Sequence, residues 1–501
     1  MAESVDGERF LMALETQLEK LSVEKGLAMY NMYQGDNSAD MNEIESRISA
    51  IYLDPANFEK LAEIAKTPLN TNSRIAVSHL RRWFTLGQVS RHPDVYKLRN
   101  EIEKEILSFR PTVGGTAVSR TEAREILRKE EHSRLRKEAY FCELPLARAI
   151  RGQVLELARL RRDLARDIGA SNYPDFALSL QDNNVKEMRR LFEFLEEQTG
   201  VQFGNYLMHL GAEAGLDEIM PWDVQFLFEK KRLPDAAFSK EGIMPAVNEV
   251  FGGMGFGIEK LGIDIKYRDI PFGGLCFGIR VPDDVRILAN PQNGHNFYGI
   301  IFHEFGHAVY SKLVEQSHYA LKGDVSNCFT EGMAVFFSRF VEDREWLLKR
   351  PGLTREMVDD YADRLTYNRI FRLRGLMSRA LLEYHIYEDT EQDIEALWAQ
   401  LNYKFLMTRS EPSEIWAASP FNVSHPVYLH NYVLAEMIAQ QIYDYLNHHY
   451  ATLLGNRVVS KFMIRNFFAP GGSVSWRDKV KYATDKPLGP GALLASIGVK
   501  Q

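Results

Sequence analysis

The chain has 501 residues, of which 45% are hydrophobic and 26% are charged. That length allows a large core, and the composition is ordinary for a globular protein, so a small disulfide-stapled scaffold and a largely disordered chain are excluded. Its 61 Lys and Arg residues against 68 Asp and Glu residues give a formal net charge of -7, which offers no overall attraction to nucleic acid or to anionic lipid.

The N-terminal residues, MAESVDGERFLMALETQLEKL, carry acidic side chains where a secretory signal peptide needs a basic start and an apolar run. No stretch of the sequence approaches the roughly 20 consecutive apolar residues that a membrane-spanning helix needs. Cys142, Cys276 and Cys328 are odd in number and form no CxxC pair, so we expect reduced, buried thiols. These features predict a cytoplasmic protein with no membrane or nucleic-acid partner.

Helical spacing dominates the sequence, with apolar residues three and four positions apart among charges over Glu122–Arg166 and Val427–Tyr450. Acidic residues alternate with the basic ones of Arg120–Arg166, which predicts a solvated helix face and not a nucleic-acid surface. Repeats and long linkers are absent from the sequence. We therefore expect a mainly α fold and one helix-rich unit of two lobes over residues 1–501.

The stretch Gly252–Gly294 is rich in glycine and proline and breaks the helical pattern. Its β-like runs LCFGIRV and VRILANP predict a small sheet. The glycines at Gly253, Gly255 and Gly257 resemble a phosphate loop only superficially, because they follow a helical run and precede no clear helix start. We expect no nucleotide site there.

The motif HExxH occurs at residues 303–307, inside the helical sequence NFYGIIFHEFGHAVYSKLV. His303 and His307 are four apart and lie on one helix face, so both imidazoles can reach one metal ion. Glu304 lies beside that face, where it can accept a proton from the attacking water. Because chance alone produces this motif in roughly two such sequences per hundred, a third ligand is needed to support it.

Glu331 is the expected third ligand. The residues after His307 do not continue as the metzincin pattern HExxHxxGxxH, which leaves a glutamate on a following helix as the usual alternative. Glu331 stands near the start of the helical, apolar sequence CFTEGMAVFFSRF. The alternative is that it is a helix-capping or surface carboxylate. Its apolar neighbours predict a buried helix, where an unpaired carboxylate is costly. We expect one Zn²⁺ per chain, held by His303, His307 and Glu331.

HEFGHAVY followed by TEGMAVFF resembles the M3 family of zinc oligopeptidases, the thimet oligopeptidase and oligoendopeptidase F group. These enzymes are gluzincins and are related to the angiotensin-converting-enzyme family. The similarity runs from about Leu160 to near the C-terminus. Its other segments are LRRDLARDIGASNYPDFAL, PWDVQFLFEKKR, GGLCFGIRVPDDVRILANPQNG and FFAPGGSVSWRDKVKYATDKPLGPGALL.

The resemblance implies a helical, two-lobed peptidase with a deep central cleft that admits only short unfolded peptides. It places a zinc-site core at about 265–345, with a small sheet next to the HExxH helix. It also implies that the peptide docks along a strand edge, for which VRILANP (Val285–Pro291) is the candidate.

The segment HPVYLHNYVLAEM resembles the family's tyrosine-rich active-site helix, expected here at about 425–447. Tyr432 matches the tyrosine whose hydroxyl donates to the tetrahedral oxyanion. His425 matches the family's upstream histidine, at a shorter spacing than in relatives. Tyr428 and His430 compete for similar roles.

These residues predict zinc-dependent hydrolysis of short unfolded peptides by an endo-acting oligopeptidase. Val335 stands where the converting-enzyme relatives have an acid, and Val423 stands where a dipeptidyl carboxypeptidase has its lysine. One alternative is a carboxypeptidase or peptidyl-dipeptidase, with a cationic anchor such as Arg409 or Lys404. Another is a peptide-binding zinc protein without catalysis. Side-chain specificity and oligomeric state stay open.

Overall fold

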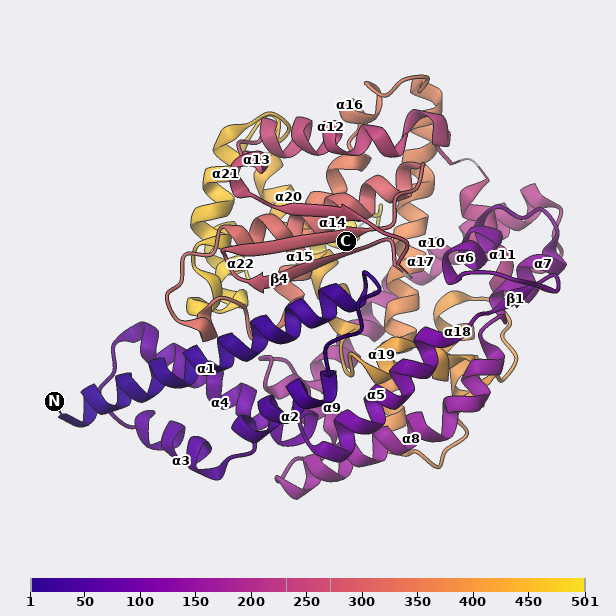
Figure 1. Ribbon diagram of the computed structural model, residues 1–501. Coiled ribbons are helices and arrows are strands. Elements are labelled where there is room, and N and C mark those ends of the chain that lie inside the picture. The colour runs from indigo at the N-terminus through magenta and orange to yellow at the C-terminus, as the bar shows by residue number, and fades with distance from the viewer. Residues whose placement is uncertain (1, 231, 271, 500–501) are drawn as a thin grey trace. The chain divides into compact units, whose positions relative to one another are not determined.

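A computed structural model of the chain describes residues 2–230, 232–270 and 272–499 (Figure 1). Met1, Lys231, Pro271, Lys500 and Gln501, which fall within ranges named above, lie outside the described residues. The fold is mainly helical with a small sheet, as predicted.

The chain divides into two compact units, each assembled from three stretches of sequence. Unit 1 comprises residues 1–96, 235–350 and 434–489, and unit 2 comprises residues 97–234, 351–433 and 490–501. Two helices, α5 (Pro93–Ser108) and α20 (His430–His449), begin in one unit and end in the other.

Unit 1 contains the HExxH helix, α14, and a three-stranded sheet. Its elements are α1 (Ala2–Met32), α2 (Met41–Tyr52), α3 (Pro55–Ile64), α4 (Thr71–Ser90), α12 (Ile243–Val247), α13 (Ile258–Leu261), β3 (Asp264–Tyr267), β4 (Gly274–Arg280), β5 (Asp284–Ala289), α14 (His295–Lys312), α15 (Asn327–Ser338), α16 (Arg344–Leu347), α21 (Arg457–Met463), α22 (Trp476–Thr484) and most of α20.

The sheet has the strand order β3-β5-β4, with β3 parallel and β4 antiparallel to β5. The predicted runs LCFGIRV and VRILANP are therefore real strands. However, β5 is the central strand and pairs on both sides, so the expectation that Val285–Pro291 forms a peptide-binding edge is wrong. The buried run of β5 is typical of a strand with neighbours on both sides. Among the described strands of this sheet, β3 and β4 form the edges.

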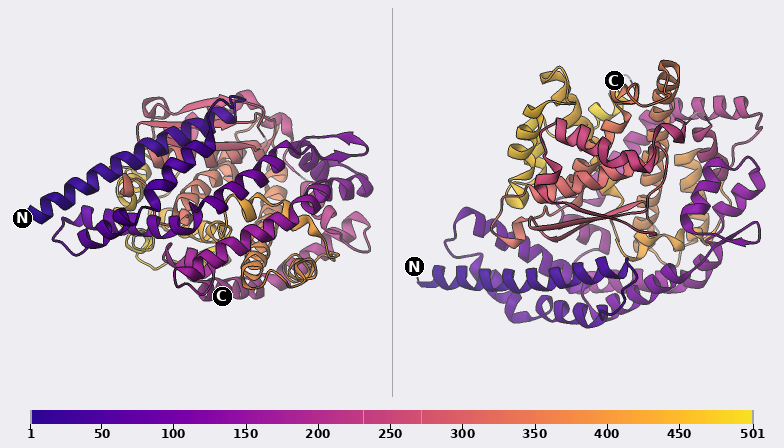
Figure 2. Two further views of the ribbon diagram at one scale, coloured as in Figure 1. Left: turned by 60° about the horizontal axis from the view of Figure 1, so that its bottom comes forward. Right: turned by 45° about the horizontal axis from the view of Figure 1, so that its top comes forward.

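Two helices cover the two faces of the sheet, as Figures 1 and 2 show for α1 along one face. Successive strand residues point to opposite faces. Phe277 and Ile279 of β4 and Leu288 of β5 pack on α1, where they meet Tyr30. The other face packs on α14. The HExxH helix therefore has a rigid support along its length.

Unit 2 is built around two long helices, α10 (Val185–Ala214) and α17 (Arg355–Glu388). Its other elements are β1 (Thr112–Val113), β2 (Thr116–Ala117), α6 (Arg120–Lys129), α7 (Ser133–Tyr140), α8 (Leu144–Asp167), α9 (Tyr173–Ser179), α11 (Pro221–Glu229), α18 (Ile394–Leu406), α19 (Pro420–Val423) and α23 (Gly491–Ser496). The helical prediction for 122–166 is thus confirmed, with breaks that give α6, α7 and α8.

The three cysteines are free thiols, as expected. Cys328 is buried, whereas Cys142 and Cys276 are half-buried. Burial raises the pKa of Cys142 to about 11 and that of Cys328 to about 12, so these two thiols stay protonated at neutral pH.

Within the described parts of the chain, we find no helix that combines the length and the apolar character needed to cross a bilayer.

Candidate metal centre and aromatic cluster

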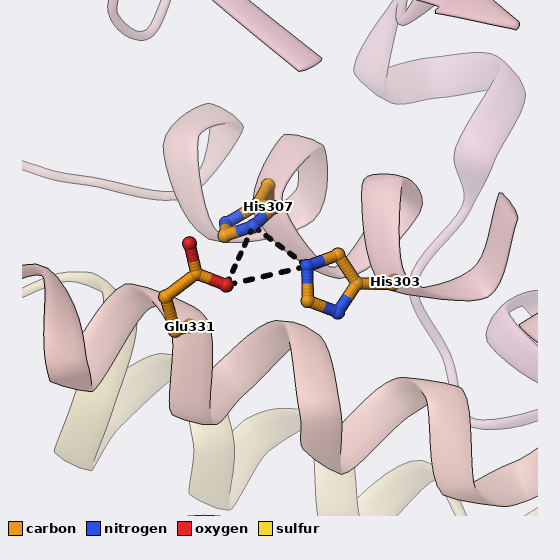
Figure 3. A group of neighbouring side chains, drawn as sticks. All are labelled: His303, His307 and Glu331. Atoms are coloured by element: carbon orange, nitrogen blue, oxygen red, sulfur yellow. Dashed lines mark hydrogen bonds and ion pairs between the residues drawn. The ribbon is translucent and has the colours of Figure 1, made fainter. Parts of the chain in front are cut away.

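His303 and His307 stand one turn apart on α14 and face the same way (Figure 3). Their Nε2 atoms are 3.2 Å apart. This is the geometry that the four-residue spacing predicts, because side chains at i and i+4 of a helix lie one above the other.

Glu331 approaches the two histidines from α15. It is 6% exposed, and its Oε2 lies 3.3 Å from Nε2 of His303 and 3.6 Å from Nε2 of His307. Gly306 allows this approach, because a Cβ at that position would stand 2.7 Å from the Cα of Ala334 on α15. The missing side chain lets the two helices pack at very short distance.

The segment between the two ligand-bearing helices is held by side chains from distant parts of unit 1. Glu15 of α1 accepts hydrogen bonds from the backbone N–H of Ala320 at 2.9 Å and from Nδ1 of His318 at 2.7 Å. Lys479 of α22, itself fully buried, donates to Asp324 at 2.8 Å. These contacts tie the segment that leads to Glu331 to α1 and α22.

The charge of Glu331 matches its neighbours. Burial by itself raises the pKa of this carboxyl, but the hydrogen bonds and charges of His303 and His307 hold it well below its usual range. In the same way, burial lowers the pKa of His307 while the contact with Glu331 raises it, and the net shift is upward. A buried carboxylate and two facing imidazoles form a site with a strong preference for a cation.

The three residues fit a zinc ion. Their ligand atoms lie 3.2, 3.3 and 3.6 Å apart, and atoms bound to zinc at 2.0–2.1 Å in tetrahedral geometry stand about 3.4 Å apart. Within the described residues, this is the one group of three or more His, Cys, Asp or Glu side chains that brings its ligand atoms within 4.8 Å of one another. Two nitrogens and one oxygen are the donor set of a catalytic zinc site, which keeps one position open.

Glu304 lies on the neighbouring face of α14, under the edge strand β4. A Cβ on Gly274 would stand 2.8 Å from Cγ of Glu304, so the backbone of β4 passes directly over this carboxylate. Cys276, two residues further along β4, has its pKa raised well above the usual value by burial first and then by the charge of Glu304. The strand that borders Glu304 is therefore β4, not the predicted β5.

His425, Tyr428 and Tyr432 form a second group, in unit 2, together with Phe421. We call these four residues the aromatic cluster. The ring centroids of Phe421 and His425 are 6.2 Å apart, those of His425 and Tyr428 are 5.7 Å apart, and those of Tyr428 and Tyr432 are 5.5 Å apart. His425 is exposed, and both tyrosines are half-buried.

His430 does not share this position. Its ring is fully buried, and burial lowers its pKa to about 3. It packs inside the protein as a neutral imidazole and is no competitor of Tyr432. The helix α20 begins at His430, because Val427 has a positive φ of 54° that interrupts the helical pattern expected from residue 425.

Two buried ionisable side chains near the aromatic cluster were not predicted from the sequence. Arg161 on α8 and Glu383 on α17 are 3% and 2% exposed and both bind the backbone before Tyr428. A signal was present in the sequence, since Glu383 interrupts the apolar run ALLEYHIY.

A cavity of about 840 Å³ lies in unit 2 along α10 and the end of α18. Arg409, one of the expected cationic anchors, lines it beside Tyr403 and Met407. The three candidate metal ligands, Glu304 and the aromatic cluster do not contribute to its walls. We therefore assign it no part in the chemistry.

Comparison with known proteins identifies the fold. No protein-family model matches the sequence, and no curated protein matches it. Solved structures do match. The M32 carboxypeptidase from Deinococcus radiodurans R1 has a TM-score of 0.69 at 14% identity, over 98% of this chain and 97% of that one.

Two other solved peptidase structures also match this chain. A protein designated oligoendopeptidase F has a TM-score of 0.68 at 16% identity, over 91% of this chain and 83% of that one. PZ peptidase A, determined with an inhibitor, has a TM-score of 0.68 at 14% identity, over 91% and 84%. The chain has the fold of these peptidases. The resemblance to the oligoendopeptidase F group is thus confirmed at the level of the fold.

Proposed function

We propose that this protein is a zinc-dependent peptidase that cleaves short unfolded peptides. The observation that carries the proposal is the triangle of His303, His307 and Glu331, whose ligand atoms are spaced for one tetrahedral ion. A similar fold in several peptidases supports it.

Different residues of the chain have different roles in the proposed reaction. Zinc, when bound, supplies a Lewis acid that polarises the peptide carbonyl and acidifies water. Glu304 accepts the proton of the attacking water and then passes it to the leaving amine. The free edge of β4 offers backbone donors and acceptors to an extended peptide beside Glu304. The hydroxyl of Tyr432 donates to the oxyanion, with Tyr428 and His425 as neighbours that support it.

We infer endo-action on oligopeptides, because the lysine that anchors a substrate carboxylate in dipeptidyl carboxypeptidases is replaced by Val423. Carboxypeptidase action is the second candidate. The specific observation in its favour is the match to the M32 carboxypeptidase, which covers 98% of this chain and 97% of the other, against 91% and 83% for oligoendopeptidase F.

We also infer a cytoplasmic location, where free thiols such as the three cysteines are usual, and no partner among nucleic acids or anionic membranes, in line with the net charge of -7.

A peptide library tests the proposal. The zinc-loaded protein is incubated with peptides of mixed sequence, each with a free or an amidated C-terminus, and the products are identified by mass spectrometry. Internal cuts in both forms are expected. If amidation abolishes cleavage, carboxypeptidase action replaces endo-action. If the zinc-loaded protein binds the peptides and cuts neither form, it is a peptide-binding protein and the proposed activity is wrong.

A further inference from the structure

The turn that carries the aromatic cluster has an unfavourable backbone. Residues 424–429 connect α19 to α20 and include His425 and Tyr428. Val427, in the middle of this turn, has a φ of 54° and is 1% exposed. A β-branched residue rarely adopts this left-handed conformation, so the surrounding structure must impose it.

Glu383 supplies one such constraint. Its Oε1 accepts the backbone N–H of Val427 at 2.7 Å, and both groups are buried. A buried N–H needs an acceptor, and here the acceptor comes from near the C-terminal end of α17 and not from the turn itself. The carboxyl thus fixes Val427 to the long helix beneath it.

Arg161 supplies the second constraint, on the residues just before the turn. Its Nη2 donates to the carbonyl oxygen of Val423 at 2.5 Å, and its Nη1 donates to that of Asn422 at 3.0 Å. Nη1 also lies 3.3 Å from the hydroxyl of Tyr387, a neighbour of Glu383 on α17. Two side chains from two helices therefore hold both ends of the segment 422–427.

The environment of Glu383 shows that this carboxyl is retained against a cost. Burial raises its pKa to about 8, although the N–H of Val427 and the charge of Arg161 act in the opposite direction. Its second oxygen finds no hydrogen-bond partner among the described residues. Glu383, Tyr387 and Asn422 border a cavity of about 10 Å³, which is the room of about one water molecule. An apolar residue would fill this site at lower cost, so the hydrogen bond to the turn is the feature that glutamate contributes.

We propose that Glu383 and Arg161 are positioning residues, which hold the turn at Val427 in its left-handed form and so aim His425, Tyr428 and Tyr432. Neither residue touches the substrate. The inference rests on the proposed function, because the aim of these side chains affects a rate only if the chain hydrolyses peptides.

Three variants test the proposal through kcat, KM and zinc content. Glu383→Leu removes the acceptor and should lower kcat roughly 10- to 100-fold, the effect of a displacement of about 1 Å, with KM within about twofold and zinc retained. Glu383→Gln keeps an oxygen acceptor for Val427 and should retain kcat within about threefold. Ser378→Ala is the matched control, because it removes a buried hydrogen bond from the same helix to Asn402 of α18 and not to the turn. It should lower thermal stability and leave kcat unchanged.

A second measurement does not depend on activity. Hydrogen exchange followed by mass spectrometry should show faster exchange over residues 422–432 in Glu383→Leu than in Ser378→Ala or Glu383→Gln. If Glu383→Leu does not fold, Arg161→Lys takes its place, since lysine cannot hold both carbonyls with a planar fork.

The outcomes separate this proposal from the proposed function. If the parent protein cuts no peptide, the proposed peptidase function is refuted. Hydrogen exchange over residues 422–432 still tests whether Glu383 holds the turn. If the parent is active and Glu383→Leu keeps its kcat and its exchange pattern, the positioning role is refuted. A kcat that falls equally in Glu383→Leu and Glu383→Gln refutes it too, because the retained acceptor would then be irrelevant.

Discussion

The three proposed metal ligands and the aromatic cluster are held in place by different means. His303 and His307 project from one regular helix, whose repeat sets their spacing, and Glu331 projects from a second regular helix that packs on it through Gly306. The aromatic cluster lies on an irregular turn whose shape depends on Glu383 and on Arg161, more than 200 residues away in the sequence. A regular element protects its site against distant changes. An irregular one makes its site depend on a few buried side chains.

The largest effect is expected from the loss of a metal ligand. His303→Ala should lose most of the bound zinc and with it all measurable hydrolysis, because two remaining ligands hold zinc weakly. Metal analysis of the purified variant, with the exposed His209→Ala as control, measures this directly. Full zinc content in His303→Ala would contradict the ligand assignment.

Glu304→Gln should keep the zinc and lose hydrolysis by roughly a hundred- to ten-thousandfold. The amide still hydrogen-bonds water but cannot accept its proton. Metal content and cleavage of a quenched peptide are measured on the same sample. Near-normal turnover in a zinc-loaded variant would exclude Glu304 as the base.

Tyr432→Phe removes the hydroxyl that is proposed to donate to the oxyanion. It should lower kcat roughly a hundredfold, with zinc retained and KM changed much less, because the hydroxyl acts mainly in the transition state. Tyr428→Phe is the matched variant, since its ring lies 5.5 Å from that of Tyr432. If kcat of Tyr432→Phe stays within about twofold of the parent, the oxyanion role passes to Tyr428 or His425.

Gly306→Ala tests the helix contact that supports the metal ligands. The new Cβ would stand 2.7 Å from the Cα of Ala334, so the helices must separate. We expect a loss of about 1–3 kcal/mol in unfolding free energy, with weaker zinc binding. Gly152→Ala is the control with the opposite sign, because that helical glycine has open space around it and alanine should stabilise the helix by about 0.5–1 kcal/mol. Equal melting temperatures for the two variants would contradict this account.

The smallest effect is a pH dependence that comes from Glu383. Burial raises its pKa from the usual value of about 4.5 to about 8 in the folded protein. Between these two pH values the folded state holds a proton that the unfolded state has lost, so the stability that this proton contributes is complete below about pH 4.5 and is lost as pH rises through 8. As pH rises from about 6 to about 9, the melting temperature of Glu383→Gln should therefore fall less than that of the parent. Parallel curves for the two proteins would show that Glu383 is not protonated in the fold.

These regions also differ in how well the sequence predicts them. His303, His307 and Glu331 follow from motif spacing and from the apolar sequence around Glu331, because helical geometry is local. The order of the strands did not follow, since an apolar run such as VRILANP is equally consistent with an edge or a central strand, and pairing depends on distant residues. The start of α20 at His430 was missed because the positive φ of Val427 is imposed by Glu383, a tertiary contact that no local pattern contains.

The contacts of Glu15 and Lys479 with the segment between α14 and α15 bear on how metal enters and leaves the protein. Glu15 and Lys479 hold residues 318–324 without help from the metal, unlike a zinc finger, which unfolds when its ion is removed. A chelator should therefore produce a folded apoprotein in which Glu331 still faces both histidines. Reloading then requires only that the ion reach the site and shed its water, so metal exchange proceeds without a refolding step.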